Sequence, residues 1–295
     1  MTSFKRELAP KIIDQLKVAP LFVKKLKADC EKGEVFPAVR DGYMSFYYAG
    51  GSLFKYGANG FSTHIKYAFV PKGSDDCYVT QEKFGTELEP DFEKGYKKIK
   101  ERCELYAGDE DTGVSNLYIF SPVSKKKEGN IFLVDIEVAF TAEKDDKIGK
   151  KRNTTDRIDI LLYDNEERQL LFCEAKLFSN GETRADKGRT PAVVEQLDRY
   201  NDQIAKNEKR IREQYAKHFE VLHDLFGTNL NPPEKVYKHC GLLLFGFDND
   251  QKKGRLEKHL PGLGEHKCYA KGEPNDLTAQ TLYEYLTKVK QNKKK

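Results

Sequence analysis

The sequence predicts an α/β protein in which a central mixed β-sheet is flanked by helices. Three stretches carry this prediction: two apolar runs joined by a short polar segment at 158–178, a long helical repeat at 190–226, and a continuous apolar run at 239–247. Two apolar runs around a turn-rich segment are typical of a β-hairpin. A wholly apolar run of strand length indicates a strand that is buried on both faces of its sheet.

The chain has 295 residues, enough to bury a sizeable core as one large domain or as a catalytic core with an added lobe. Its 51 Lys and Arg residues nearly balance its 47 Asp and Glu residues, for a formal net charge of +4. This balance argues neither for nor against nucleic acid, because a local basic patch can be hidden in a near-neutral total. No apolar run has membrane-spanning length and no signal-peptide pattern follows Met1, so we expect a cytoplasmic protein without membrane contact.

The cysteines are widely spaced, form no CxxC pair and lie mostly among apolar residues. We expect free thiols in a reducing compartment, with neither a disulfide framework nor a zinc site. The six positions are Cys30, Cys77, Cys103, Cys173, Cys240 and Cys268.

The first 83 residues are expected to form a helical and β-meander region. A helix is expected at 3–32, interrupted at Pro20, with a lysine-rich face opposite an apolar stripe. We interpret that face as solvated, with phosphate contact as the alternative.

From 35 to 70, aromatic and β-branched runs separated by Gly-containing turns predict a three-stranded antiparallel meander. Its Tyr and Phe side chains are interleaved with Arg40, Lys55 and Lys66, an arrangement that suits a base-stacking platform. The two faces of a half-buried sheet explain the same pattern, and we favour the sheet.

The core domain is expected at 84–250. Its first part should comprise a helix at 90–106, a loop at 108–113, and strands at 116–123 and 131–140. Asp135 and Glu137 share one face of the second strand, and a solvent-facing pair is favoured over a place in an acidic site.

The hairpin places two carboxylates side by side. If Asp164 pairs with Gln169 around a four-residue loop, counting back along the strands sets Asp159 opposite Glu174. Like charges that face each other destabilise a sheet, and burying them without a partner costs much more. Lys176 lies on the same face as Glu174, but one ammonium group does not neutralise two carboxylates. Oxygen ligands at this density suit Mg²⁺ or Mn²⁺.

The long helix after the hairpin should begin with Thr190 as N-cap and Pro191 in the first turn, and end at Gly227. His218 and His223 are spaced wrongly for two ligands on one helical face, so we expect them on the helix surface. Residues 251–295 are expected to add a short helix and a basic tail.

Asp159, with Glu174-Ala175-Lys176 on the next strand, resembles the core of the PD-(D/E)xK nuclease superfamily. Gln196 and Tyr200 match the Gln-xxx-Tyr motif on the helix after the core strands in RecB-type members. Other acid-x-Lys triplets in the chain lie in polar segments, whereas this one lies inside a strand opposite a second acid. The resemblance covers about residues 130–248 and implies a restriction-endonuclease-like core.

The resemblance also implies roles for these residues. Asp159, Glu174 and the backbone carbonyl of Ala175 would hold Mg²⁺ or Mn²⁺, while Lys176 would position or deprotonate the attacking water. The Gln-Tyr pair would orient metal-site groups and the substrate phosphate. No iron–sulfur cluster is expected, because the four cysteines that bind one in some RecB-type relatives have no counterpart here.

Relatives often take a further acid from the first core helix, for which Glu89 and Glu93 are the candidates. From the strands, Asp135 or Glu137 are the candidates. The spacing of these acids does not choose among them.

Two basic loops, at 141–155 and 179–189, lie at the ends of the hairpin strands, where a phosphate backbone would approach. The expected nucleic-acid-binding side chains are Lys150, Lys151, Arg152, Arg184, Lys187 and Arg189. We therefore expect a metal-dependent deoxyribonuclease in a setting such as bacterial or phage defence, restriction or repair. RNA as substrate and a homo-oligomeric state are left open.

Three other interpretations stay open beside this one. The strand carboxylates and their lysine would also fit an ion-pair ladder on an open sheet face. A nuclease-like fold can serve as a catalytically silent module that binds nucleic acid or a partner protein, because fold does not establish activity. A small-molecule phosphohydrolase is the third, although the basic loops suit a polymer better.

Overall fold

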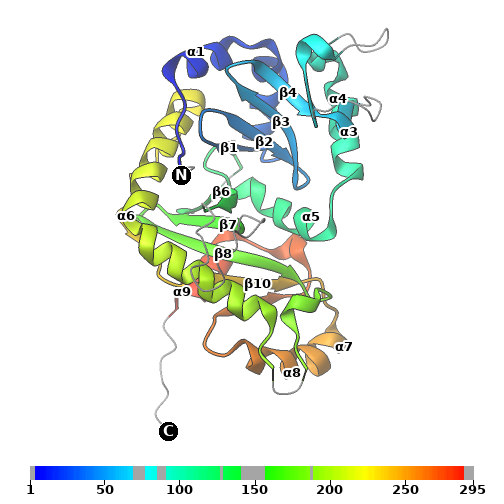
Figure 1. Ribbon diagram of the computed structural model, residues 1–295, viewed down its shortest axis with the longest axis vertical. Coiled ribbons are helices and arrows are strands. Elements are labelled where there is room, and N and C mark those ends of the chain that lie inside the picture. The colour runs from blue at the N-terminus through cyan, green and yellow to red at the C-terminus, as the bar shows by residue number, and fades with distance from the viewer. Residues whose placement is uncertain are drawn as a thin grey trace, which may run out of the picture.

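The computed structural model describes residues 4–68, 77–84, 91–126, 129–140, 157–186 and 189–288. It contains two β-sheets flanked by helices, one in the upper and one in the lower half of the molecule, and one long helix runs along both (Figure 1). The predicted α/β class, with a mixed sheet covered by helices, is confirmed. No helix in these ranges is both long enough and apolar enough to cross a membrane.

The upper sheet has five strands in chain order, all antiparallel. It extends the expected three-stranded meander by one strand at each end. Its tight turns place Gly50 and Gly60 at φ values of 83° and 77°, which glycine adopts without strain. The strands are β1 (Phe36–Val39), β2 (Met44–Tyr48), β3 (Gly51–Gly57), β4 (Gly60–His64) and β5 (Tyr78–Thr80).

Helices cover one face of this sheet. Phe46 and Phe54 pack there against α4 (Phe92–Leu105) and against the C-terminal part of α6 (Ala192–Phe226). The helix expected after residue 90 therefore exists, but it packs on the upper sheet and not within the lower core. The other helical segments of the upper half are α1 (Pro10–Val18), η1 (Phe22–Leu26), α2 (Lys27–Glu31), α3 (Ile65–Ala68) and η2 (Gln81–Lys83). The expected interruption near Pro20 is present, since Ala19 before it is extended.

The lower sheet is mixed. Three strands form an antiparallel meander, β6 (Ile131–Ala139), β7 (Arg157–Asp164) and β8 (Gln169–Leu177). Parallel to β8 run β10 (Gly241–Phe245) and the short β9 (Lys235–Val236), and β11 (Cys268–Lys271) follows beside β10. The long helix α6 connects β8 to β9 and β10, as parallel neighbours require a crossover connection.

Both faces of this sheet are covered. One carries α6, and the other carries α5 (Asp109–Ser115), η3 (Asn116–Phe120) and α9 (Ala279–Thr287). All five residues of β10 are buried, which confirms the strand expected from the apolar run. The remaining turns at the lower end are η4 (Gly181–Thr183), α7 (Asn249–Gln251), η5 (Lys252–Leu256), α8 (Glu257–His259), η6 (Leu260–Leu263) and η7 (Pro274–Asp276). The part of the chain after residue 250 thus adds a strand to the core sheet, and not only the expected helix.

Two local predictions are wrong between β5 and β6. Residues 108–113, expected as a loop, lie largely in α5, where three acids fill the first turn and complement the positive end of the helix. Residues 116–120, expected as part of a strand, form the 3₁₀ helix η3 with Leu117 and Tyr118 buried. Short apolar runs do not distinguish strands from buried helical turns by their periodicity.

The helix α6 is continuous over 35 residues and ends at Gly227 with φ 69°, as expected. Its N-cap is Pro191, without a side-chain cap, whereas Thr190 was expected there. His223 is exposed, but His218 is fully buried, so its expected place on the helix surface is wrong. Burial lowers the pKa of His218 to about 3, so its ring is neutral.

His218 lies beside a buried ionic network centred on Asp135, which is fully buried. The Asp135 carboxylate accepts hydrogen bonds from Arg6 Nε at 2.8 Å, Arg40 Nη1 at 2.7 Å and the Tyr215 hydroxyl at 2.8 Å. The expected solvent-facing pair of Asp135 and Glu137 is therefore wrong. A bulge between Leu133 and Asp135 breaks the simple alternation of β6.

Asp135→Asn is expected to lower the free energy of unfolding by about 3–5 kcal/mol, because it leaves two buried arginines without their counter-charge. Burial alone would raise the pKa of Asp135, but Arg40 and Arg6 lower it overall. Its stabilisation is thus present above the unfolded-state pKa near 3.8 and is lost as the pH falls through the lower folded-state value. Urea unfolding at a series of pH values should show the gap between variant and wild type narrowing in acid. Glu93→Gln, which breaks an exposed pair with Lys24, should change stability by less than about 1 kcal/mol.

Candidate active site

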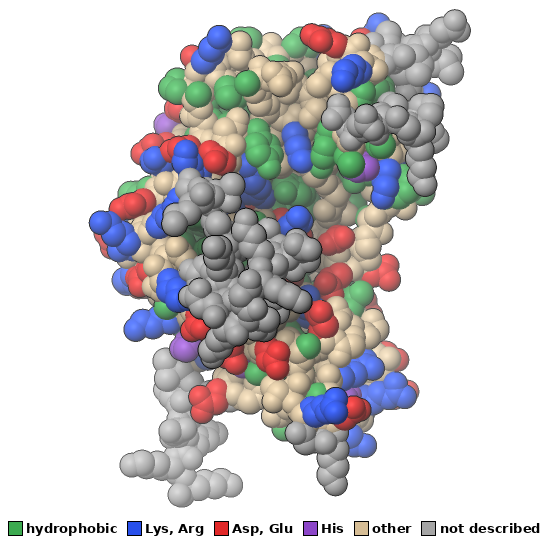
Figure 2. Space-filling view, viewed as in Figure 1, with side chains coloured by type: hydrophobic (Ala, Val, Ile, Leu, Met, Phe, Trp, Pro, Cys, Tyr) green, Lys and Arg blue, Asp and Glu red, His purple; other side chains and the backbone are tan. Residues whose placement is uncertain are grey.

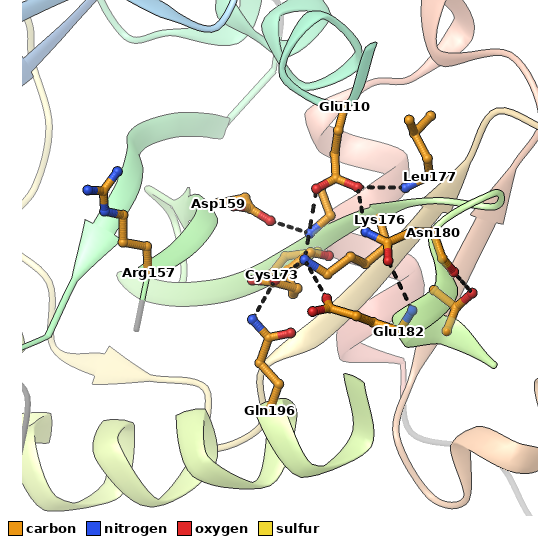
Figure 3. Close-up of polar contacts among 12 residues, drawn as sticks. Glu110, Arg157, Asp159, Cys173, Lys176, Leu177, Asn180, Glu182 and Gln196 are labelled. Atoms are coloured by element: carbon orange, nitrogen blue, oxygen red, sulfur yellow. Dashed lines mark hydrogen bonds and ion pairs between the residues drawn. The ribbon is translucent and has the colours of Figure 1, made fainter. Parts of the chain in front are cut away.

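The hairpin brings Asp159 next to Glu174, as the sequence predicts. The strand register pairs Leu161 with Phe172 and Ile160 with Cys173, so the next position sets Asp159 opposite Glu174. At this position a side chain takes part in the bonding between the two strands: Asp159 Oδ2 accepts a hydrogen bond from the backbone N–H of Ala175 at 2.8 Å (Figure 3). The acid of one strand is thereby fixed against the backbone of the other.

Glu174 is only 1% exposed and is held by two donors. Its Oε1 accepts from Lys176 Nζ at 2.8 Å and from Gln196 Nε2 at 2.9 Å. Its Oε2 is buried and has no hydrogen-bond partner within the described ranges. A buried carboxylate oxygen without a donor is rare in folded proteins, and a bound ion or an ordered water would satisfy it.

The Gln-xxx-Tyr pair on α6 positions both strands. The Tyr200 hydroxyl donates to the carbonyl of Arg157 at 2.5 Å and accepts from Gln196 Nε2 at 2.7 Å. Gln196 and Tyr200 are one turn apart on the same helical face, so one side chain holds β7 just before Asp159 while the other holds Glu174 on β8. The five side chains of the predicted catalytic set are thus brought together.

The helix acid in the site is Glu110 of α5. Its Oε2 accepts the Leu177 N–H at 2.9 Å, and its Oε1 lies 3.8 Å from Lys176 Nζ. Figure 3 shows Glu110 reaching toward Lys176 from one side of the sheet, while Gln196 points to the sheet from the other. Of the two expected helix acids, Glu93 pairs with Lys24 on the upper half, and Glu89 lies outside the described residues.

Glu110 was missed because its segment was interpreted as a loop. The sequence held a usable signal: Gly108 followed by three acids is typical of the first turn of a helix. A helix assigned there would have made Glu110 a candidate for the acid that relatives often take from a helix.

Glu137 of β6 extends the row of acids to a third strand. Ile136 pairs with Ile160 and Val138 with Ile158, which sets Glu137 opposite Asp159. Its φ of 51° is unusual for a residue other than glycine, and its side chain pairs with Arg157 at 2.8 Å. Glu137, Asp159, Glu110 and Asp111 line one small cavity. Figure 2 shows acidic side chains at mid-height on this face, between the upper and lower halves.

The charges of the site oppose one another. The pKa of Asp159 is raised because its carboxylate is shielded from water and lies beside Glu174, and burial also raises the pKa of Glu174. Burial alone would lower the pKa of Lys176, but the carboxylates of Glu174 and Asp159 raise it above its ordinary value. The pKa values of both acids and of Lys176 are thus shifted in the same direction, upward.

The donor set fits a hard divalent cation. Among the described residues, no three His, Cys, Asp or Glu side chains gather closely enough to hold a metal by themselves. Two carboxylates with one backbone carbonyl, from Asp159, Glu174 and Ala175, need no third side chain, and oxygen donors suit Mg²⁺ or Mn²⁺. The unpartnered Oε2 of Glu174 is the observation that favours this fit.

The predicted nucleic-acid-binding residues are only partly described. Arg184 is half-buried, donates to the Phe178 carbonyl at 2.5 Å and lies over the Phe178 ring. Arg189 is exposed. Four of the expected contacts lie outside the described residues: Lys150, Lys151, Arg152 and Lys187.

No protein-family model, no curated protein and no solved structure matches this chain.

Asp159→Asn is expected to raise the melting temperature of the metal-free protein, because it removes the repulsion between facing carboxylates. Each kcal/mol of relief corresponds to about 2–4 °C in a protein of this size. The asparagine oxygen can still accept the Ala175 N–H, so the local contact is kept. Thermal unfolding in EDTA measures the effect, with Asp202→Asn on the exposed side of α6 as the control. A lower melting temperature for Asp159→Asn would contradict the repulsion.

Proposed function

We propose that this protein is a Mg²⁺- or Mn²⁺-dependent deoxyribonuclease with a PD-(D/E)xK active site. The observation that carries the proposal is the convergence of Asp159, Glu174 and Lys176 at one end of a buried hairpin, with Gln196 and Tyr200 holding the acids in place. Buried charges are rarely kept in a core sheet without a use, and titratable groups with shifted pKa values gather at functional sites.

The arrangement of the lower sheet supports the same proposal. An antiparallel meander carries the acids, and a crossover helix then leads to a buried parallel strand. Helices cover both faces, so the acids emerge at a sheet end and not on an open face. This placement disfavours an ion-pair ladder on a solvated surface, and it is compatible with a restriction-endonuclease-like core.

Phosphodiester hydrolysis needs an activated water, neutralisation of charge on the phosphate and help for the departing oxygen. A divalent cation, when bound, supplies Lewis acidity and lowers the pKa of a water. The residues of the chain do the rest. Gln196 fixes one oxygen of Glu174, which leaves the other free to act as a ligand.

Lys176 Nζ lies 2.8 Å from Glu174 Oε1, and the neighbouring carboxylates raise its pKa. It can donate to a phosphate oxygen or to the attacking water while Glu110, 3.8 Å away, limits its movement. Its buried position gives these interactions more weight than they would have in water. We propose DNA restriction, defence or repair as the setting of this activity.

Wild-type protein is expected to cleave plasmid or linear DNA in Mg²⁺ or Mn²⁺ and not in EDTA. Glu174→Gln should abolish cleavage, because the amide offers a weaker ligand and loses the charge that holds the cation. Calorimetry should show a matching loss of Mg²⁺ or Mn²⁺ affinity. Unchanged metal affinity in both Glu174→Gln and Asp159→Asn would refute the metal site. Binding of DNA by wild type without any hydrolysis would instead favour a catalytically silent binding module.

Lys176→Ala is expected to lower single-turnover cleavage by about 10²- to 10⁴-fold, the range for a lost proton-transfer or positioning group. Metal affinity should not fall, because the change removes a cation from the site. Lys176→Arg should not restore the rate, since a planar guanidinium group differs in size and shape from the compact ammonium group. Lys209→Ala, which removes an exposed lysine of α6, is the control. Cleavage by Lys176→Ala within a few-fold of wild type would mean that this triplet is not catalytic.

A further inference from the structure

A cleft of about 510 Å³ lies between the upper sheet and the edge of the lower sheet. From the upper sheet it is lined by Tyr43, Tyr47, Lys55 and Tyr78, and Arg157 lies on the lower side. Its size is within the range of about 300–1,000 Å³ that is typical of small-ligand sites. The cleft therefore suits an occupant of the size of one or a few nucleotides.

The strand register explains why these side chains share one face. Ser45 pairs with Lys55 and Tyr47 with Ser52, and cross-strand partners project to the same side. Between them, Phe46 and its cross-strand partner Phe54 point to the opposite face, which is covered by helices. The sheet is half-buried, as we favoured from the sequence. Of the basic residues in the alternative arrangement, Arg40 and Lys55 line the cleft and Lys66 does not.

The cleft is continuous with the candidate active site. Gly50, Asp111 and Glu137 line both this cleft and the small cavity that reaches Asp159 and Glu110. A polymer strand lying in the cleft would thus have one of its phosphates directed toward the acids.

The cleft offers the groups that an unpaired nucleotide needs. Tyrosine side chains and Lys55 line it, together with Arg6 and Arg40, which are bonded to Asp135, and Arg157, which pairs with Glu137. The ammonium group of Lys55 lies 3.7 Å from the ring centroid of Tyr78 and 5.8 Å from that of Tyr43. Ser52 Oγ is buried without a hydrogen-bond partner among the described residues, so a polar ligand atom could bind it.

We propose that this cleft binds an unpaired DNA strand next to the bond to be cut, an inference that rests on the proposed nuclease function. Aromatic faces inside a cleft reach a base only when that base is not stacked in a duplex. Basic side chains among the aromatic rings contact phosphates without selecting a sequence. The preferred substrate is therefore single-stranded DNA, or duplex DNA with an unpaired end.

Fluorescence anisotropy of a labelled single-stranded oligonucleotide in EDTA tests the cleft without cleavage. Tyr43→Ala should weaken binding by about 5- to 100-fold, the loss expected for one stacked base, while Tyr43→Phe should bind like wild type because it keeps the ring. Lys55→Ala should weaken binding and lower the slope of log affinity against log salt by about 0.7. Lys66→Ala is the matched control, because Lys66 also lies over a tyrosine ring, that of Tyr106, but does not line the cleft.

The two proposals fail in different ways. The cleft proposal would be overturned if Tyr43→Ala and Lys55→Ala bound DNA as tightly as wild type. It would also be overturned if wild type bound a blunt duplex more tightly than the single strand. Both results would count even if the protein cuts DNA. Weakened binding in both variants, with no cleavage by wild type in Mg²⁺ or Mn²⁺, would support the cleft and reject the nuclease. The melting temperatures of the variants, compared with wild type, show that each one is folded.

Discussion

The buried carboxylate of Asp135 is the contact on which the arrangement of the two sheets depends. Its partners come from the N-terminal segment, from the turn after β1 and from α6, while Asp135 itself belongs to β6. Arg40 also donates to the carbonyl of Ile136, so the upper sheet is bonded to the backbone of the lower one. Buried ionic groups contribute stability only when every polar atom is matched, and this network meets that condition at the carboxylate. Two members of the network, Arg6 and Arg40, also line the cleft between the sheets.

Asp135 and Asp159 lie on neighbouring strands of one sheet, but their pKa values are shifted in opposite directions. The pKa of Asp135 is lowered because two guanidinium groups outweigh its burial, whereas the pKa of Asp159 is raised because burial and Glu174 act in the same direction. Donors on both oxygens make Asp135 a structural group. Glu174, by contrast, has a buried oxygen without a partner among the described residues, and Asp159 lies beside it. Opposite pKa shifts within one sheet thus separate a structural acid from candidate functional ones.

Local sequence patterns were sufficient for the hairpin and for the helix that follows it. Counting from a four-residue turn sets Asp159 against Glu174, and the Gln-Tyr spacing sets both side chains on one helical face. The burial of Asp135 could not be predicted in the same way. Its partners Arg6 and Arg40 lie 129 and 95 residues away, and periodicity tells which face a side chain shares but not what lies above that face. Glu110 was missed for a local reason, a short helix mistaken for a loop.

The length of α6 has a consequence for how the molecule can be divided. At about 1.5 Å per residue its 35 residues extend for roughly 50 Å, past both sheets. Its first turns hold Gln196 and Tyr200 at the acids, and its last turns bury Val221, Leu222 and Leu225 against the upper core. A chain cut between the two halves would leave that apolar end facing water. The two halves therefore share one helix. A recombination event that exchanged the upper sheet would also have to exchange the C-terminal end of α6, which packs against that sheet.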